Sequence, residues 1–91
     1  MNYQVLREIS LLPSTSTGRT KHFAGSRELP TPAKLQIAQY VNGSGFYLFY
    51  LDDHGSIMTD TFHDSMEGAM DQAQWEFDIE MKDWKIINSG G

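Results

Sequence analysis

The chain contains no cysteine among its 91 residues. This absence excludes disulfide bonds, thiolate metal ligands and thiol nucleophiles, and it suits a reducing compartment. A long hydrophobic run is also missing near the start of the chain, where Arg7 and Glu8 interrupt the apolar pattern of residues 1–12. A signal peptide or a membrane helix would need such a run. We therefore expect a cytoplasmic protein that does not bind a membrane.

Motifs of common catalytic and cofactor sites are absent too. The sequence has no G-x-S-x-G elbow, no phosphate-binding P-loop and no dinucleotide fingerprint. Of its histidines, His54 and His63 have aspartates beside them, but no second histidine at helical spacing completes a ligand set. Asp60 and His63 point to opposite faces if they lie in one strand. We expect no metal, no cofactor and no enzymatic activity.

Basic residues are scarce in the second half of the chain. The net charge is −5, yet residues 1–45 hold five basic and two acidic residues, whereas residues 46–91 hold two basic and ten acidic ones. The second half is therefore an acidic pole, which repels nucleic acid and favours a cationic protein partner. A solvated helix face that keeps a small protein soluble would give the same composition, so this alternative stays open.

Proline occurs at only three positions, Pro13, Pro30 and Pro32, which lie at the two ends of one segment. Between them the composition shifts to serine, threonine, glycine and basic residues. This pattern predicts a long polar loop over residues 12–32 within a single domain, 1–91. Residues 88–91 are expected to be a flexible tail.

Alternating apolar residues predict four strands. In residues 3–11, Tyr3, Val5, Ile9 and Leu11 share one side. Residues 34–41, 46–51 and 56–62 follow, with turns at 42–45 and 52–55, and predict an antiparallel meander. Counting four residues in each turn gives two nearly equally apolar faces. The first holds Leu35, Ile37, Val41, Phe46, Leu48, Tyr50 and Ile57, and the second holds Ala38, Tyr40, Tyr47, Phe49, Leu51, Met58 and Phe62.

One amphipathic helix is predicted after the meander. It begins near Ser65, whose hydroxyl can cap free backbone N–H groups. Apolar residues at 66, 69, 70, 73 and 77 form one stripe, and Trp75 lies off it. Residues 84–87 then supply a short edge strand. The predicted fold is α+β: an antiparallel meander sheet of four to five strands, in the order β-β-β-β-α-β, with the helix on one face. The other face needs the loop, a second copy or a partner to cover it.

The second half of the chain resembles a known type of protein. The resemblance lies in the run Gly-Phe-Tyr-Leu-Phe-Tyr-Leu-Asp at 45–52, the turn through Gly55, and residues 59–65 with the Glu67, Ala69, Gln72, Ala73 and Phe77 that follow. This pattern is similar to a type of small bacterial α+β protein, and some proteins of that size and acidity are immunity proteins that neutralise toxins. The resemblance implies a bacterial origin and an α+β fold, and it includes no catalytic motif.

The sequence therefore favours a non-enzymatic interaction module, in the form of an immunity-type inhibitor that binds a basic partner. Trp75 is the expected aromatic anchor of one acidic surface. The carboxylates of that surface are Asp52, Asp53, Asp60, Asp64, Asp71 and Glu76. Two alternatives remain: a self-associating structural or regulatory module that forms a homodimer through an aromatic sheet face, and a small-ligand binder.

Overall fold

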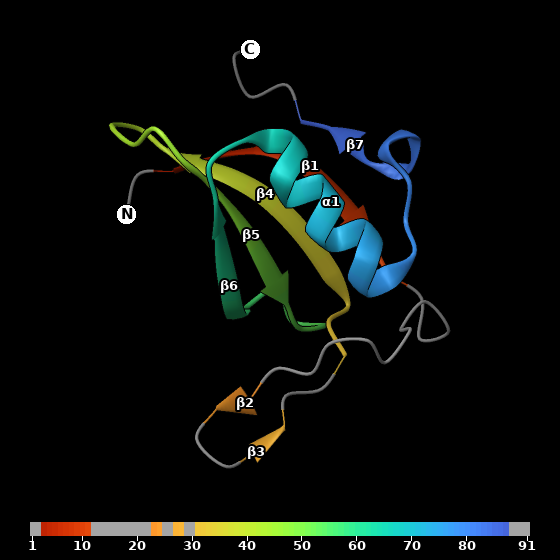
Figure 1. Ribbon diagram of the computed structural model, residues 1–91. Coiled ribbons are helices and arrows are strands. Elements are labelled where there is room, and N and C mark those ends of the chain that lie inside the picture. Colours follow the sequence, from red (N-terminus) through yellow and green to blue (C-terminus); the bar gives the residue numbers. More distant parts are fainter. Residues whose placement is uncertain (1–2, 12–22, 25–26, 29–30, 88–91) are drawn as a thin grey trace.

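A five-stranded antiparallel sheet with a single helix on one face forms the body of the computed structural model, which describes residues 3–11, 23–24, 27–28 and 31–87 (Figure 1). The strands lie in the spatial order β6-β5-β4-β1-β7. They are β1 (Tyr3–Ser10), β4 (Lys34–Tyr40), β5 (Phe46–Leu51), β6 (Ile57–His63) and β7 (Lys85–Ile86), and the helix is α1 (Met66–Phe77). The predicted α+β fold, its meander and its order β-β-β-β-α-β are confirmed. No helix in the described ranges is long and apolar enough to cross a membrane.

A second, two-stranded sheet lies in the segment predicted as a loop. Strands β2 (Phe23–Ala24) and β3 (Arg27–Glu28) pair antiparallel, and Figure 1 shows them beyond the end of the main sheet. At these residues the structure differs from the predicted loop. The sequence carries a signal for this hairpin, because a Gly-Ser pair separates the two short runs. The predicted tail at 88–91 lies outside the described residues.

The ends of α1 follow from local sequence. At the start, the Ser65 hydroxyl accepts a hydrogen bond from the Gly68 N–H at 3.0 Å, which confirms the predicted cap. At the end, Asp78 adopts the left-handed conformation with φ of 56°, and its backbone N–H donates a hydrogen bond to the Gln74 carbonyl. The next residues form a short 3-10 helix, η2 (Met81–Asp83), before β7.

The hydrophobic core lies between α1 and one face of the sheet. The strands contribute Leu35, Ile37, Leu48 and Tyr50, and the helix contributes Ala69, Met70, Ala73 and Phe77. Ile79 and Trp84, which follow the helix, complete this core together with Leu11. The predicted apolar stripe of the helix is therefore confirmed, and the sheet face that it covers is the first of the two predicted faces.

A β-bulge in β1 changes which residues of that strand face the helix. The register with β4 shifts between Val5 and Arg7, so that Val5 lies opposite Ala38 whereas Ile9 lies opposite Leu35. Directly opposite residues share a face of an antiparallel sheet. The prediction that Tyr3, Val5, Ile9 and Leu11 share one side is therefore wrong, because one extra residue, Leu6, reverses the alternation.

A second bulge in β6 corrects the predicted sheet faces. Tyr50 lies opposite Thr59, but Leu51 lies opposite Ile57, so Ile57 belongs to the face away from the helix. Its side chain is 42% exposed. Val41 lies in the turn after β4 and is 68% exposed. Neither residue therefore belongs to the helix-covered face that simple strand alternation predicts for it.

The sheet face opposite the helix carries a cluster of aromatic rings. Tyr3, Tyr40, Tyr47, Phe49 and Phe62 contact one another with centroid separations from 5.1 to 6.3 Å, mostly edge to face. Phe49, Leu51 and Ala38 form a second, smaller hydrophobic cluster, against which Tyr3 and Tyr47 pack. Phe62 remains 55% exposed at the rim of this aromatic cluster. The two faces thus differ: one is closed by α1, and the other presents aromatic edges.

Candidate functional site: the outer face of α1

The side of α1 that faces away from the sheet carries an acidic stripe. Glu67, Asp71, Gln74 and Asp78 are all exposed, and their spacing of i, i+4, i+7 and i+11 aligns them along one side of the helix axis. Trp75 lies beside this stripe and is 52% exposed. Its indole is therefore only half-buried and does not belong to the buried side of the helix.

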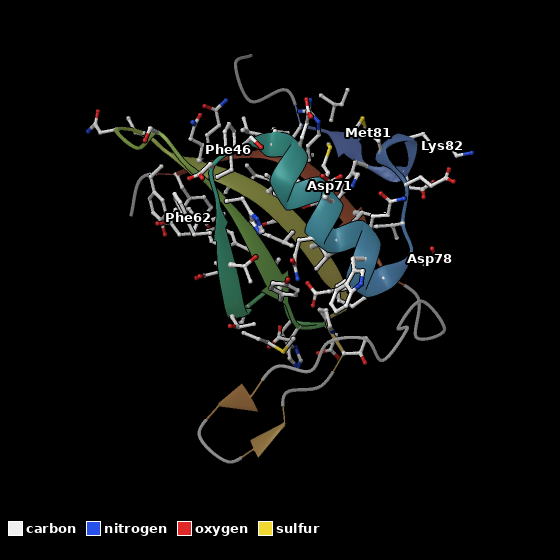
Figure 2. All side chains as sticks on the ribbon, in the orientation of Figure 1. Phe46, Phe62, Asp71, Asp78, Met81 and Lys82 are labelled. Atoms are coloured by element: carbon white, nitrogen blue, oxygen red, sulfur yellow. The ribbon has the colours of Figure 1, made fainter. Side chains whose placement is uncertain are left out.

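Trp75 and two carboxylates share a shallow cleft at the C-terminal end of the helix. Asp71, Gln74, Trp75 and Asp78 line this cleft, whose volume is about 330 Å³. Figure 2 shows Asp71 midway along α1 and Asp78 at its end. The C-terminal end of a helix carries the negative pole of the backbone dipole, and α1 has no basic residue in its last turn. The carboxylates of Asp71 and Asp78 and the helix dipole therefore all contribute to a negative potential at the cleft.

No side chain of the described residues neutralises this cleft. From Asp52 to Met81 the sequence contains neither lysine nor arginine. The nearest lysine in the sequence, Lys82, pairs with Glu80 at 3.3 Å. Asp71 and Asp78 consequently have no ion-pair partner in the part of the chain that the structure describes. A cationic group from outside the chain would meet carboxylates that no described side chain neutralises.

The residues of the predicted acidic surface lie on several sides of the molecule. Asp71 and Trp75 meet in the cleft, and Asp64 precedes the helix at the opposite end. Asp60 lies on β6 opposite Phe49, on the sheet face away from the helix. The predicted opposite orientation of Asp60 and His63 is confirmed, because His63 pairs with Phe46 of the helix-covered face.

Asp52 and Asp53 occupy the turn between β5 and β6. The Asp52 carboxylate accepts hydrogen bonds from the backbone N–H groups of Ser56 and His54, each at 2.9 Å, and these bonds lower the pKa of Asp52. Gly55 takes a positive φ of 85°, which an L side chain rarely adopts. The predicted polar turn is confirmed, and Asp52 stabilises it. In the described ranges, no group of three histidine, aspartate or glutamate residues is arranged to hold a metal ion.

Glu76 is the predicted surface carboxylate that the structure buries. Its side chain is 3% exposed and accepts hydrogen bonds from the Tyr50 hydroxyl and from Gln72 Nε2, the latter at 2.9 Å. The assignment of Glu76 to a partner surface is therefore wrong. Spacing gives the reason, because residue 76 follows Ala69 by seven positions and Ala73 by three, which places it on the buried side of the helix.

The buried cluster around Glu76 includes two further groups that can ionise. Burial and the Glu76 hydrogen bond raise the pKa of Tyr50 above its ordinary value. Burial also lowers the pKa of His63, which Glu76 and Asp64 partly offset. Such groups can transfer protons in an accessible site, but Tyr50 and Glu76 are enclosed between helix and sheet. In this conformation the cluster therefore fixes α1 to β5.

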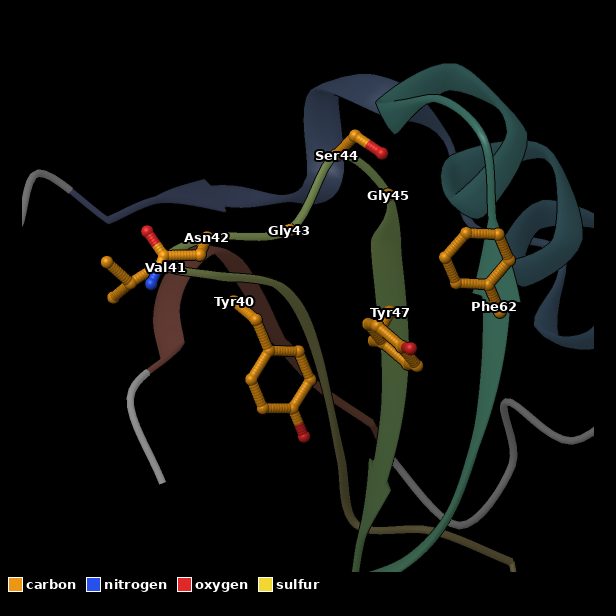
Figure 3. A pocket seen from close by; sticks show the side chains of 8 residues that line it. All are labelled: Tyr40, Val41, Asn42, Gly43, Ser44, Gly45, Tyr47 and Phe62. Carbon is orange, nitrogen blue, oxygen red and sulfur yellow. The ribbon is translucent and has the colours of Figure 1, made fainter.

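A second hollow lies on the aromatic face, at the turn between β4 and β5. Residues 41–45 line it together with the rings of Tyr40, Tyr47 and Phe62, which Figure 3 shows side by side on three neighbouring strands. Its volume is about 500 Å³. The Phe62 ring lies over Gly45, where an added Cβ would come within 2.1 Å of the ring. Glycine at this position therefore permits the ring to cover the strand.

Comparisons with known proteins do not identify this site. The chain matches no protein-family model, no curated protein and no solved structure. The resemblance to small bacterial proteins thus rests on the residues of the second half alone. The geometry and the charge of the described residues are therefore what indicates a function.

Proposed function

We propose that the protein is a non-enzymatic interaction module that binds a basic protein through the outer face of α1. The observation that carries this proposal is the half-exposed Trp75 in a cleft with Asp71 and Asp78, which have no ion-pair partner in the described ranges. A tryptophan at the centre of an interface is a frequent energetic anchor. Carboxylates around it orient a cationic partner and raise the association rate.

The chemistry of the cleft favours a guanidinium or ammonium group as the central contact. Such a cation can lie on the face of the Trp75 indole while it pairs with the carboxylates of Asp71 and Asp78. The sequence resemblance supplies the specific form of this function, an immunity-type inhibitor of a basic toxin in the bacterial cytoplasm. The product of a neighbouring gene is accordingly the partner to test.

Trp75→Ala should weaken binding of the neighbouring gene's product by at least about thirtyfold, which corresponds to about 2 kcal/mol. The loss should appear as faster dissociation, because a buried anchor holds the formed complex. Removing the charges with Asp71→Asn and Asp78→Asn should instead slow association and flatten its dependence on salt. Surface-immobilised binding kinetics at two salt concentrations measure both rates.

Asp60→Asn and Asp53→Asn are matched controls, because each removes one carboxylate from another part of the surface. These variants should leave the association rate nearly unchanged. Equal slowing by all four variants would show that the whole acidic pole acts, without a specific site on α1. If reversing both charges with Asp71→Lys and Asp78→Lys does not change the association rate, the outer face of α1 is not the binding surface.

The exposed rim of the aromatic face favours self-association as a second candidate function. Phe62 and Val41 line the same hollow and are 55% and 68% exposed, and apolar side chains gathered in this way mark interfaces. Under this candidate, sedimentation equilibrium should show a homodimer that Phe62→Asp dissociates. Ile86→Asp is the matched control, because Ile86 is also 68% exposed but lies on β7. A wild-type monomer at about 1 mM would contradict this candidate.

A further inference from the structure

A second groove, separate from the acidic cleft, runs beside the N-terminal half of α1. Its apolar lining includes Met66 and Met70 of the helix, Met81 of η2 and Ile86 of β7. Figure 2 shows Met81 on the segment beside the helix. The volume of the groove is about 500 Å³, which falls within the range of small-molecule pockets.

The groove is apolar and adaptable. Trp84 and Met70 are 6% and 8% exposed and form its buried side, whereas Met81 and Ile86 are 63% and 68% exposed. Methionine is unbranched and flexible, so three thioether side chains can follow the shape of an irregular apolar ligand. An apolar chain in this groove would remove exposed hydrophobic surface from water, which is favourable.

A cation without a carboxylate partner lies at the same groove. Arg7 of β1 is half-buried, and its Nη1 atom donates to the Leu6 carbonyl at 2.8 Å. No carboxylate of the described residues lies within ion-pair distance of its guanidinium, and the adjacent Glu8 is paired with Lys34 at 3.7 Å. A guanidinium has five N–H donors and binds a carboxylate through two parallel hydrogen bonds.

Two other charged residues line the groove. Lys82 adds a second cation, which is 79% exposed and paired with Glu80. Glu67 is the acidic residue among its lining side chains. An anionic ligand would therefore place its charge at Arg7, which lacks a carboxylate partner in the described ranges, and away from Glu67. The apolar lining would hold the uncharged remainder of that ligand.

We propose that this groove binds a small amphipathic carboxylate, of the kind represented by a medium-chain fatty acid. The carboxylate pairs with Arg7, and the hydrocarbon chain lies against Met66, Met70 and Met81. Charge complementarity and the size of the groove together select this ligand class. The inference does not depend on the proposed binding cleft at Trp75, because the groove and that cleft share no lining residue.

Trp84 provides a direct measurement of binding. In a Trp75→Phe background it is the only tryptophan, so its emission reports the groove. Titration with sodium decanoate should give a saturable change in that emission. Arg7→Gln should weaken decanoate binding by about tenfold or more. Decanol has the same chain without the charge, and it should bind wild type and Arg7→Gln alike.

Several variants separate a specific site from general adsorption. Met81→Ser should weaken decanoate binding, whereas Phe62→Ser, which removes an exposed apolar residue from the aromatic face, should not. Arg7→Lys keeps the charge but loses the paired hydrogen bonds, so its affinity should fall between those of wild type and Arg7→Gln. Circular dichroism and thermal melting must show that each variant is folded. If Arg7→Gln does not fold, Arg7→Lys takes its place as the test of the guanidinium.

Four results would overturn the assignment. The first is no saturation by decanoate at about 1 mM. The second is equal affinity for decanoate and decanol in the wild-type protein, and the third is unchanged affinity in both Arg7 variants. Binding of a short peptide with a C-terminal phenylalanine, in place of decanoate, would assign the groove to a protein C-terminus and would also overturn it.

Discussion

Replacing Phe77 with alanine should lower the free energy of unfolding by about 3 to 5 kcal/mol. Phe77 is the last residue of α1, is 5% exposed, and its ring centroid lies 6.3 Å from that of Tyr50 in the core. The substitution removes most of this buried ring and leaves a cavity that the sheet cannot fill. Small domains have total stabilities of only about 5 to 15 kcal/mol, so urea denaturation should detect a large loss.

Phe62→Ala is the matched control for this prediction. It makes the same change at a ring that is 55% exposed on the other face of the sheet. Its cost should be less than half of that of Phe77→Ala, because a half-exposed ring loses less apolar burial. A Phe77→Ala loss under about 1 kcal/mol would contradict the packing of α1 described above.

Local sequence signals account for the parts of the fold that were predicted correctly. The cap at Ser65, the polar turn at 52–55 and the apolar stripe of α1 each depend on residues within a few positions of one another. Such signals can be read from sequence because the physics is local. The meander followed from them, since short turns between apolar strands permit few other arrangements.

The two bulges could not be predicted in this way. A single extra residue in a strand, at Leu6 in β1 and at Met58 in β6, reverses the alternation on which the assignment of faces depends. Neither position carries a glycine or another distinctive residue. The misplacement of Tyr3 and Ile57 is therefore a consequence of long-range pairing, which a strand's own sequence does not encode.

The candidate site was predicted only in part, for two physical reasons. Glu76 was placed on the surface because it is charged, although its spacing from Ala69 and Ala73 puts it on the buried side. Asp60 was grouped with the helix because it is close in sequence, although strand alternation turns it to the other face. Helical periodicity places Asp71 and Trp75 on the outer part of α1, and in the structure both line the same cleft.

The apolar groove at Arg7 had no sequence signal. Its lining comes from β1, α1, η2 and β7, which are distant in the chain and meet only because β7 pairs with β1. In the sequence, Arg7 appeared merely as an interruption of an apolar row. Whether a cation is paired depends on its neighbours in space, and only the structure supplies them.

Glu76→Ala should lower the free energy of unfolding by about 2 to 5 kcal/mol, because it removes the acceptor of one buried and one partly buried donor. The donors are the Tyr50 hydroxyl and the Gln72 amide. Glu76→Gln is the matched variant, since it keeps the shape and one acceptor oxygen, and its loss should be smaller. A loss under about 1 kcal/mol in Glu76→Ala would show that these hydrogen bonds contribute little to stability. Urea denaturation at neutral pH provides the comparison.

Alkaline pH should test the same buried cluster independently. Because the pKa of Tyr50 is raised in the folded protein, the unfolded chain loses this proton first, at the ordinary tyrosine pKa of about 10. The contribution of Tyr50 to stability is therefore constant below about pH 10 and declines above it, by up to about 1.4 kcal/mol per pH unit. Tyr50→Phe should remove this part of the decline, although it lowers stability at neutral pH. Urea denaturation between about pH 8 and pH 11 measures the difference, in which the ionisation of the other tyrosines and lysines cancels. Parallel curves for wild type and Tyr50→Phe would mean that burial and the Glu76 hydrogen bond do not raise the pKa of Tyr50 in the folded protein.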